Sequence, residues 1–320
     1  MSDRPTSPST AAIWTAMIAI YIVWGSTYLA IRFAVETIPP FLMAGFRFLF
    51  AGLILYGWRI LSGDRPPTLR QWRSAAIIGI LLLLGGNGLV SWAEQHIASG
   101  VAAVLVGTVP LWIVLIDALL VRRKPRARIL LGVLIGFGGI VLLVGPWQEA
   151  YQVDLLGALA VVMGALLWAG GSIYSRGADL PESPLLGTGM EMLSGSAGLL
   201  IAGTLLGEWP GFEWASVSVE SLAGLGYLIV FGSLIGFTAY TWLLRNAPTP
   251  LVSTYAYVNP LVAVLLGAVL ADEVLNWRVM LATLIIIGSV VLITRAPKKE
   301  TLSTDFTDYT DLKERKKTAD

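Results

Sequence analysis

Long apolar stretches separated by short polar segments recur ten times along the chain. Six of them carry no charged residue over 20 or more positions: 74–93, 97–116, 129–148, 155–175, 221–244 and 246–271. The other four are 11–31, 40–58, 185–206 and 279–294. About 20 apolar residues in a helix span a bilayer, and a helix satisfies its own backbone polar groups in lipid. The pattern therefore predicts an all-α membrane protein with ten transmembrane helices.

The chain also contains an internal repeat. A shift of 150 residues pairs Gly86 with Gly236, Trp92 with Trp242, Pro110 with Pro260, and Gly138 with Gly288. Nearer the start of each copy, a shift of 144 residues pairs Trp24 with Trp168, Arg32 with Arg176, and Pro40 with Pro184. Because each copy has five spans, an odd number, the second copy starts on the opposite side of the membrane and is inverted relative to the first. We expect two inverted five-helix repeats, 11–148 and 149–295.

Charge is sparse and unevenly placed. Charged residues make up 13% of the chain and hydrophobic residues 56%. If the N-terminus is cytoplasmic, the segments on that side carry 19 of the 22 Lys and Arg residues, leaving only Arg32, Arg47 and Arg278. Basic residues stay on the cytoplasmic side of membrane proteins. This predicts a cytoplasmic N-terminal segment, 1–10, and a cytoplasmic tail, 296–320, whose few apolar residues favour disorder.

Two prolines occupy matching positions in the repeats. Pro110 and Pro260 each fall in the middle of a predicted span. A proline inside a helix removes one hydrogen bond and frees the carbonyl four residues before it. We expect a helix kink at each proline. The kinks either serve packing alone or shape a central cavity between the repeats.

Polar and aromatic side chains lie at helical spacing on several predicted spans. In the third span, for example, Asn87, Ser91 and Glu94 share one stripe. The residues that we expect to contact a substrate are Trp24, Tyr28, Asn87, Ser91, Trp112, Trp168, Tyr257 and Asn259. An asparagine in hydrocarbon must find a hydrogen-bond partner, which favours an internal cavity. The alternative for the aromatic residues is a belt at the membrane interface.

Two charged residues occupy matching positions within spans, Arg47 in the second and Glu191 in the seventh. Such residues are functional hypotheses by default. Arg47 lies seven residues after Pro40, and Glu191 lies seven residues after Pro184. Because the two helices enter the membrane from opposite sides, a vertical gap of ~10 Å separates the two side chains, which argues against a direct ion pair. Arg47 either supports the site or extends toward the outer headgroups. Glu191 is either a coupling carboxylate or a neutral structural acid.

The residue inventory argues against an enzyme. The chain has no cysteine, one histidine (His96) and no Gly-Lys-Ser/Thr motif. A metal site, a nucleophile with a histidine base, and a nucleotide-binding loop are therefore not expected. An intramembrane enzyme would require His96 to lie beside a carboxylate within a cleft. We expect no cofactor, no metal and no nucleic-acid partner.

The chain resembles the drug/metabolite transporter (DMT) superfamily, in its ten-helix EamA form, over about residues 12–295. The resemblance rests on Trp24-Gly25-Ser26-Thr27-Tyr28, Arg47-Phe48, Pro110-Leu111, Pro260-Leu261 and Asp272-Glu273. It implies a carrier of the plasma membrane that exports amino acids or other small metabolites without ATP and alternates access around a central cavity. The chain departs from the family pattern at Arg123, where a glutamate is usual.

Together these observations predict a secondary transporter in the bacterial inner membrane. We expect it to export an amino acid or related small organic metabolite by alternating access. Its expected partners are the small-molecule substrate, the lipid bilayer, and a proton or an exchange substrate. The alternative is a passive channel or pore, which would need a continuous polar lining. Uniport, exchange and proton antiport all fit these residues, and the oligomeric state is left open.

Overall fold

The computed structural model describes residues 9–121, 127–144, 153–210, 212–247, 249–252 and 254–294. All regular structure in these ranges is helical. The helices are α1 (Thr10–Ala34), α2 (Pro40–Leu61), α3 (Leu69–Gly79), η1 (Ile80–Gly88), α4 (Leu89–Ala93), α5 (Ser99–Val106), α6 (Val109–Val121), α7 (Ala127–Val144), α8 (Leu155–Ser175), α9 (Pro184–Leu205), η2 (Trp214–Ser216), α10 (Val219–Tyr227), η3 (Leu228–Ile235), α11 (Gly236–Asn246), α12 (Thr249–Val252), α13 (Tyr255–Leu270) and α14 (Trp277–Thr294).

Within the described ranges, seven helical stretches are long and apolar enough to cross a membrane. They are Thr10–Ala34, Pro40–Leu61, Leu69–Ala93, Ser99–Leu120, Leu155–Ser175, Pro184–Leu205 and Val219–Leu243. Three shorter apolar helices, Ala127–Leu143, Val258–Leu270 and Trp277–Leu292, lie where the remaining spans are predicted. The all-α fold with ten membrane helices is confirmed.

Polar residues fix where the helices begin. The Ser9 hydroxyl accepts a hydrogen bond from the Ala12 N–H at the start of α1. Thr68 and Gln71 form a reciprocal capping box at the start of α3. Asp154 caps α8 by accepting from the Gly157 N–H. Each side chain satisfies a donor that the first helical turn leaves free, which lets the apolar spans start at defined residues.

Helices α2 and α9 pack against each other in antiparallel fashion, and their contacts repeat across the two halves. A Cβ added at Gly45 would lie 2.6 Å from Leu200 Cδ2, and one at Gly189 would lie 2.8 Å from the Tyr56 backbone nitrogen. The shift of 144 residues converts the first contact into the second. The repeats are therefore inverted relative to each other, as predicted.

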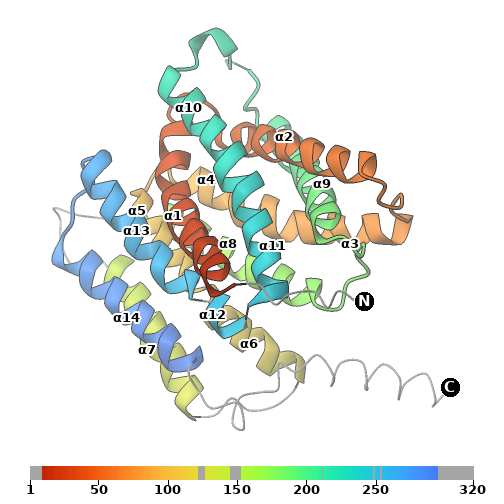
Figure 1. Cartoon of the computed structure of the whole chain (residues 1–320). Helices are drawn as coiled ribbons and strands as arrows, with labels where there is room; N and C mark the ends of the chain where they lie inside the picture. Colours follow the sequence, from red (N-terminus) through yellow and green to blue (C-terminus); the bar gives the residue numbers. More distant parts are fainter. Residues whose placement is uncertain are drawn as a thin grey trace.

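Helices α7 and α14 form a second antiparallel pair of the same kind. A Cβ at Gly136 would lie 2.8 Å from Ser289 Oγ, and one at Gly139 would lie 2.8 Å from Ile286 Cγ1. The shift of 150 residues relates these two contacts. Small residues let the backbones approach closely. The α7–α14 pair lies at one edge of the bundle and α2–α9 at the other, with α1, α13 and α8 between them (Figure 1).

The third span of each repeat contains a π-helical segment. η1 interrupts the span between α3 and α4, and η3 interrupts the equivalent span between α10 and α11. π-helical turns are rare and occur frequently at functional sites. Both repeats therefore carry a π-helical segment at nearly equivalent positions of the third span.

The two prolines have different surroundings. The fourth span is interrupted between Val106 and Val109, so that Pro110 is the second residue of α6. The Thr108 hydroxyl donates to the Leu105 carbonyl at 2.6 Å across this break. Pro260 lies inside α13. A Cβ at Gly107 would lie 3.3 Å from Pro260 Cγ, so the broken helix and the proline-containing helix meet there.

Candidate functional site

Trp24 of α1 lies at the centre of an aromatic cluster contributed by the second repeat. Its indole Nε1 donates to the Gly232 carbonyl of η3 at 3.2 Å. Its ring centroid lies 5.4 Å from that of Phe237, 5.0 Å from Tyr240 and 5.2 Å from Tyr255. Edge-on and tilted aromatic pairs of this kind are favourable and directional. Trp24 is thus held between the repeats, away from the lipid-facing positions of an interfacial belt.

Trp168, the partner of Trp24 in the repeat, makes the equivalent contact in the first half. A Cβ at Gly86 in η1 would lie 2.8 Å from Trp168 Cε3. The Trp168 carbonyl accepts a hydrogen bond from the Ser172 hydroxyl at 2.7 Å. Trp24 likewise lies against Gly236, where a Cβ would collide with its indole. Each tryptophan therefore packs on a glycine in the third span of the opposite repeat.

Arg47 is buried in the protein, so the alternative in which it extends toward the outer headgroups is wrong. Its side chain is 4% exposed, and Nε donates to Ser233 Oγ of η3 at 3.0 Å. A Cβ at Gly232 would lie 3.1 Å from Arg47 Nη2 and 3.0 Å from Thr27 Cγ2. The π-helical turn leaves room for the guanidinium, and Ser233 orients it. The partner of the Arg47 guanidinium is therefore Ser233. The sequence itself argued against a direct pair between Arg47 and Glu191.

Glu94, one residue beyond the end of α4, is fully buried. Neither carboxyl oxygen has a hydrogen-bond partner among the described residues. The Arg32 guanidinium donates instead to the Glu94 backbone carbonyl at 2.9 Å. Burial, together with the like charge of Glu273, raises the pKa of Glu94 well above its usual range, and Arg32 and Arg47 oppose that shift.

Further buried polar atoms lack partners within the part of the chain that the structure describes. They are the Ser91 hydroxyl in α4, the Asn259 Oδ1 in α13, the Trp112 Nε1 in α6, the Ser196 hydroxyl in α9 and the Arg278 Nε in α14. Ser91 precedes Glu94 by three residues and shares its helix face. Asn259 borders α1, because a Cβ at Gly25 would lie 3.3 Å from the Asn259 carbonyl. Buried polar groups without partners are rare in native proteins and call for an explanation, such as a ligand or water.

The structure brings several of the predicted site residues together near α1 and leaves the others apart. Trp24 belongs to α1, and Arg47 and Asn259 lie against that helix. Tyr28, also of α1, packs against the apolar cluster that contains Val90, and Tyr28 lies within electrostatic range of Glu94. Ser91 lies on the same helix face as Glu94, which faces Tyr28. Trp168 lies apart, against Gly86.

The remaining candidates lie elsewhere. Asn87 donates from Nδ2 to the Leu82 carbonyl of its own helix at 3.5 Å. Trp112 packs edge-on against Phe137 of α7, with ring centroids 5.0 Å apart. Glu191 of α9 approaches α3 through its backbone carbonyl, which would collide with a Cβ at Gly79. The Tyr257 side chain lies outside the described residues.

The residues that the site-residue prediction left out are Glu94, Ser233, Tyr240 and Tyr255. Glu94 carried a usable signal, because its spacing of three from Ser91 places a charge on the polar stripe of the third span. Tyr255 also carried a signal, because it lies four residues before Asn259 on one face of the predicted ninth span. Ser233 and Tyr240 are recognised from the packing of the second repeat around α1.

A cavity of about 460 Å³ reaches Gln95, the residue after Glu94, and we name it the vestibule. It is lined by residues 35–41, Trp92, Gln95, Leu206 and Glu208. The Glu208 carboxylate accepts hydrogen bonds from the backbone N–H groups of Phe41, at 3.2 Å, and Leu42, at 2.9 Å, so it caps α2. The half-buried position of this carboxyl raises the pKa of Glu208.

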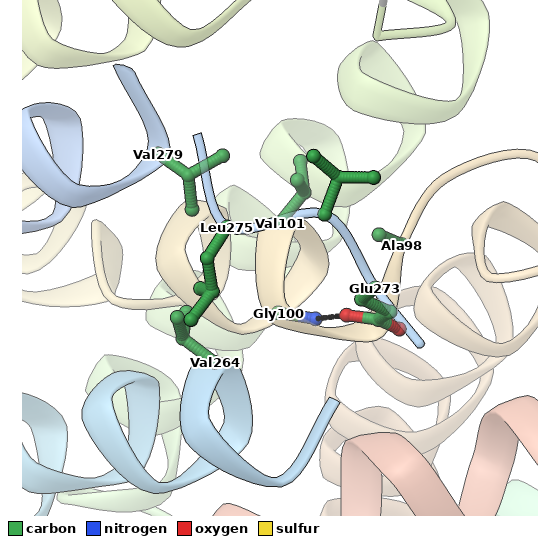
Figure 2. A pocket seen from close by; sticks show the side chains of 8 residues that line it. Ala98, Gly100, Val101, Val264, Glu273, Leu275 and Val279 are labelled. Carbon is green, nitrogen blue, oxygen red and sulfur yellow. Dashed lines mark hydrogen bonds between the residues drawn. The ribbon is translucent and has the colours of Figure 1, made fainter. Parts of the chain in front are cut away.

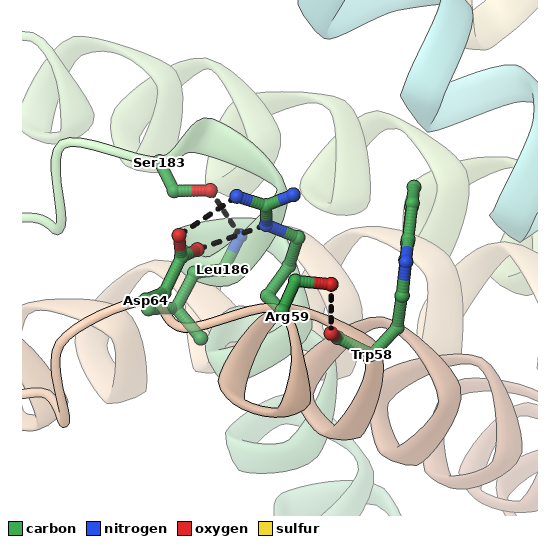
Figure 3. A network of polar contacts seen from close by, with 6 residues as sticks. Trp58, Arg59, Asp64, Ser183 and Leu186 are labelled. Carbon is green, nitrogen blue, oxygen red and sulfur yellow. Dashed lines mark hydrogen bonds and ion pairs between the residues drawn. The ribbon is translucent and has the colours of Figure 1, made fainter.

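Among the described residues, the opposite end of the bundle carries three ion pairs, and we name it the ion-pair end. Arg59 Nη2 lies 2.7 Å from Asp64 Oδ1, and Ser183 lies beside this pair (Figure 3). Arg70 pairs with Asp179 at 3.3 Å, and Arg176 pairs with Asp117 at 3.2 Å. The Arg59 guanidinium lowers the pKa of Asp64 below its usual value. The Arg59–Asp64 pair lies within α2 and the turn that follows it, and the other two pairs connect α3 and α6 to the segment between α8 and α9.

Comparison with known proteins identifies the family. The sequence profile of the EamA-like transporter family matches residues 10–145 and 155–295. The chain belongs to the EamA-like transporter family. It is 41% identical over 290 residues to the uncharacterized inner membrane transporter YedA of Escherichia coli K12, covering 88% of this chain and 90% of that protein. It is 23% identical to the uncharacterized transporter YoaV of Bacillus subtilis, covering 86% and 94%.

A solved crystal structure with 19% sequence identity aligns with a TM-score of 0.59 and covers 89% of this chain and 98% of that one. At this identity the likeness concerns the fold alone. Family membership and the ten helices together make the chain a multi-pass transporter of the inner membrane rather than an enzyme. DMT membership, as indicated by the sequence motifs, is confirmed.

One EamA motif residue has a clear structural role. Glu273 accepts hydrogen bonds from the Ser99 N–H and hydroxyl, both at 2.7 Å, and from the Gly100 N–H at 3.0 Å. Figure 2 shows its carboxylate directed at Gly100, beside a cavity of about 10 Å³. A carboxylate on the first N–H groups of α5 is stabilised by the helix dipole. Glu273 thus fastens the second repeat to the first. Arg123, the departure from the family pattern, lies outside the described residues.

Proposed function

We propose that this EamA-like transporter is a secondary carrier that exports a small organic solute, such as an amino acid, by alternating access. The substrate binds where α1 meets the second repeat, between Trp24, Arg47 and Asn259. The observation that supports this proposal is a pair of buried polar atoms without partners among the described residues, Ser91 Oγ and Asn259 Oδ1. Asn259 and the buried Arg47 both lie against the packing surface of α1, at Gly25 and beside Thr27. Such groups are costly unless a ligand or water completes them.

The chemistry of these groups suits a compact solute with both polar and apolar parts. The Arg47 guanidinium uses Nε for Ser233, which leaves its Nη groups for a carboxylate, and guanidinium binds carboxylates with matched geometry. The Asn259 amide oxygen accepts a hydrogen bond. Trp24 and its neighbouring rings supply an apolar wall. Tyr28 and Ser91 complete the site on the side of Glu94.

The inverted repeats suggest how access alternates. In inverted-repeat carriers, one repeat rocks against the other around a fixed site. Trp24 on Gly236 and Trp168 on Gly86 are the same contact in opposite orientations. In this mechanism the two contacts tighten and loosen in turn, and each opens the site to one side.

We also propose that the ion-pair end faces the cytoplasm and the vestibule faces the periplasm. Lys and Arg concentrate in the segments at the ion-pair end, which is the cytoplasmic pattern. Both termini then lie in the cytoplasm, and the two repeats cover 11–148 and 149–295. The vestibule provides the outward path for an exported solute.

Counterflow in proteoliposomes tests the carrier proposal. Vesicles containing the purified protein are preloaded with unlabelled neutral L-amino acids, and uptake of the same mixture, radiolabelled, is measured. We expect saturable uptake that the internal substrate accelerates. Flux that rises without saturation and ignores the internal substrate would indicate a pore instead.

Asn259→Ala should raise the half-saturating concentration about tenfold, which corresponds to about 1.4 kcal/mol for one lost hydrogen bond. Asn246→Ala is the matched control. Asn246 donates to the Trp242 carbonyl of its own helix at 2.8 Å, near the ion-pair end. Equal kinetics for the two variants would remove Asn259 from the site.

A further inference from the structure

We propose that Glu94 is the proton-binding residue of this carrier and that its protonation is coupled to the transport cycle. The coupling to transport rests on the proposed carrier function. The binding of a proton at Glu94 does not, because it is a property of the folded protein. The sequence had offered Glu191 for this role, and the structure provides a better-equipped carboxyl.

The position of Glu94 favours the protonated form in the arrangement observed. Its side chain is fully buried, and neither oxygen has a partner in the described ranges. An ionised carboxylate removed from water without hydrogen bonds is strongly disfavoured, and such a group neutralises instead. A proton needs no additional space, so the closed packing around Glu94 accommodates it.

The charges around Glu94 allow the carboxyl to ionise when water reaches it. Arg32 and Tyr28 face it from α1, and Arg47 faces it from α2. Glu273 faces it from the segment after α13, but its oxygens are already occupied at the start of α5. Two guanidinium groups thus oppose one carboxylate. A hydrated, ionised Glu94 would gain hydrogen bonds from water in addition to these charges, whereas the buried carboxyl has no hydrogen-bond partner among the described residues.

The other carboxyls near this end are exposed or already hydrogen-bonded; Glu208, for example, is half-buried and caps α2. His96 is exposed and packs edge-on against Trp92, with ring centroids 4.6 Å apart. Asp154 is bonded to Gly157 at the start of α8. Neither one competes with Glu94 for a buried position. Glu94 is therefore the buried carboxyl at this end whose oxygens are free to take a proton.

A path for the proton lies next to Glu94. Gln95, its neighbour in sequence, lines the vestibule, together with Trp92 on the same helix end. Arg32 holds the backbone at this point by its bond to the Glu94 carbonyl. A modest opening between Gln95 and α1 would bring water from the vestibule to the carboxyl. Protonation would then accompany each closure, and ionisation would accompany each opening.

Infrared difference spectroscopy on the purified full-length protein tests proton binding directly. Spectra are recorded between about pH 5 and about pH 9, above the range in which ordinary carboxyls titrate. Wild type should show the C=O stretch of a protonated carboxyl that persists toward neutral pH. Glu94→Gln should lose this band and keep a wild-type unfolding temperature, because glutamine has the same shape. Glu213→Gln, which removes an exposed carboxyl from an outer loop, should retain it.

The result that overturns the proposal is equally specific. A band that survives in Glu94→Gln but disappears in Glu191→Gln would assign the proton to Glu191. Absence of the band in wild type would also refute the proposal. Glu94→Asp, which keeps a carboxyl, should restore the band, and this guards against misfolding of the glutamine variant.

The transport arm uses the amino-acid counterflow assay with and without a pH gradient. Wild type should respond to the gradient, while Glu94→Gln should show gradient-independent counterflow. If wild type shows no counterflow with this mixture, the carrier proposal fails while the infrared result stands on its own. If both proteins respond equally to the gradient, proton coupling at Glu94 is refuted and the carrier function remains.

Discussion

The indole of Trp24 lies directly against Gly236, and no side chain other than hydrogen fits at that position. Trp24 belongs to the first helix of one repeat and Gly236 to the third span of the other. The same relationship recurs between Trp168 and Gly86. Two equivalent contacts in an inverted pair of repeats provide two places at which the halves meet.

Replacing Gly236 with alanine should destabilise the protein, because the added Cβ collides with a rigid indole rather than a flexible chain end. Overpacking of this kind costs about 1–3 kcal/mol. We expect a lower unfolding temperature for Gly236→Ala, and likewise for Gly86→Ala, in a thermal-shift measurement. Gly226→Ala is the matched control, because nothing lies within 4 Å of a Cβ there. Equal unfolding temperatures for Gly236→Ala and Gly226→Ala would contradict the packing described.

Glu273→Gln should weaken the attachment of the second repeat to α5. It removes the charge from three hydrogen bonds to Ser99 and Gly100. Hydrogen bonds to a charged group contribute about 1.5–3 kcal/mol. Thermal unfolding should show the loss, and Glu220→Gln, an exposed substitution at the start of α10, should not. A Glu273→Gln protein as stable as wild type would show that the cap contributes little.

Arg47→Lys should impair transport although it keeps the positive charge. Lysine lacks the planar group that uses Nε for Ser233 and presents the remaining donors to a carboxylate. We expect the half-saturating concentration in counterflow to rise about tenfold or more, as for one lost charge-assisted bond. Arg65→Lys, on the exposed turn after α2, controls for the substitution itself. Unchanged kinetics in Arg47→Lys would place the substrate elsewhere.

The ion-pair end should remain closed at neutral pH and loosen only in acid. Arg59 lowers the pKa of Asp64 in the folded state, so the pair contributes stability above the unfolded pKa of Asp64. That contribution is lost as the pH falls through the lowered folded value. A spin label at Arg65→Cys, unique in this cysteine-free chain, should become mobile only below the usual titration range of aspartate.

Asp64→Asn should make the same label mobile already at neutral pH, because the amide cannot form the ion pair. A label whose mobility ignores both acid and Asp64→Asn would show that Arg59 and Asp64 do not hold the turn. Asp272→Asn, which changes a carboxyl at the other end of the bundle, should leave the label unaffected.

Much of the fold follows from the sequence because the length and apolar composition of a segment predict a membrane span. The duplicated positions also predict the inversion, and Gly45 with Leu200 and Gly189 with Tyr56 show it in contacts. The helix break before Pro110 was harder to predict from the sequence. A mid-span proline indicates a disturbed helix, but the bonds of Thr108 decide that α5 ends and α6 begins there.

The proposed site follows from the sequence only in part, since helical periodicity gives a face and not its partner. Trp24, Arg47 and Asn259 were predicted because aromatic, charged and amide groups in a membrane span favour an internal site, and their contact with substrate stays a prediction. Ser233 and Tyr240 were missed because only the packing of η3 and α11 on α1 gives them a role. The Asn87 amide, an equally strong signal, turns back to its own helix.

Pulsed electron paramagnetic resonance between spin labels tests alternating access most directly. One cysteine pair, Gln95 with Leu206, spans the vestibule, and a second, Arg65 with Gly177, spans the ion-pair end. On addition of neutral L-amino acids or a change of pH, we predict reciprocal changes, with one distance lengthening as the other shortens. Two distances that stay fixed, or that lengthen together under every condition, would contradict a carrier built from inverted repeats around one shared site.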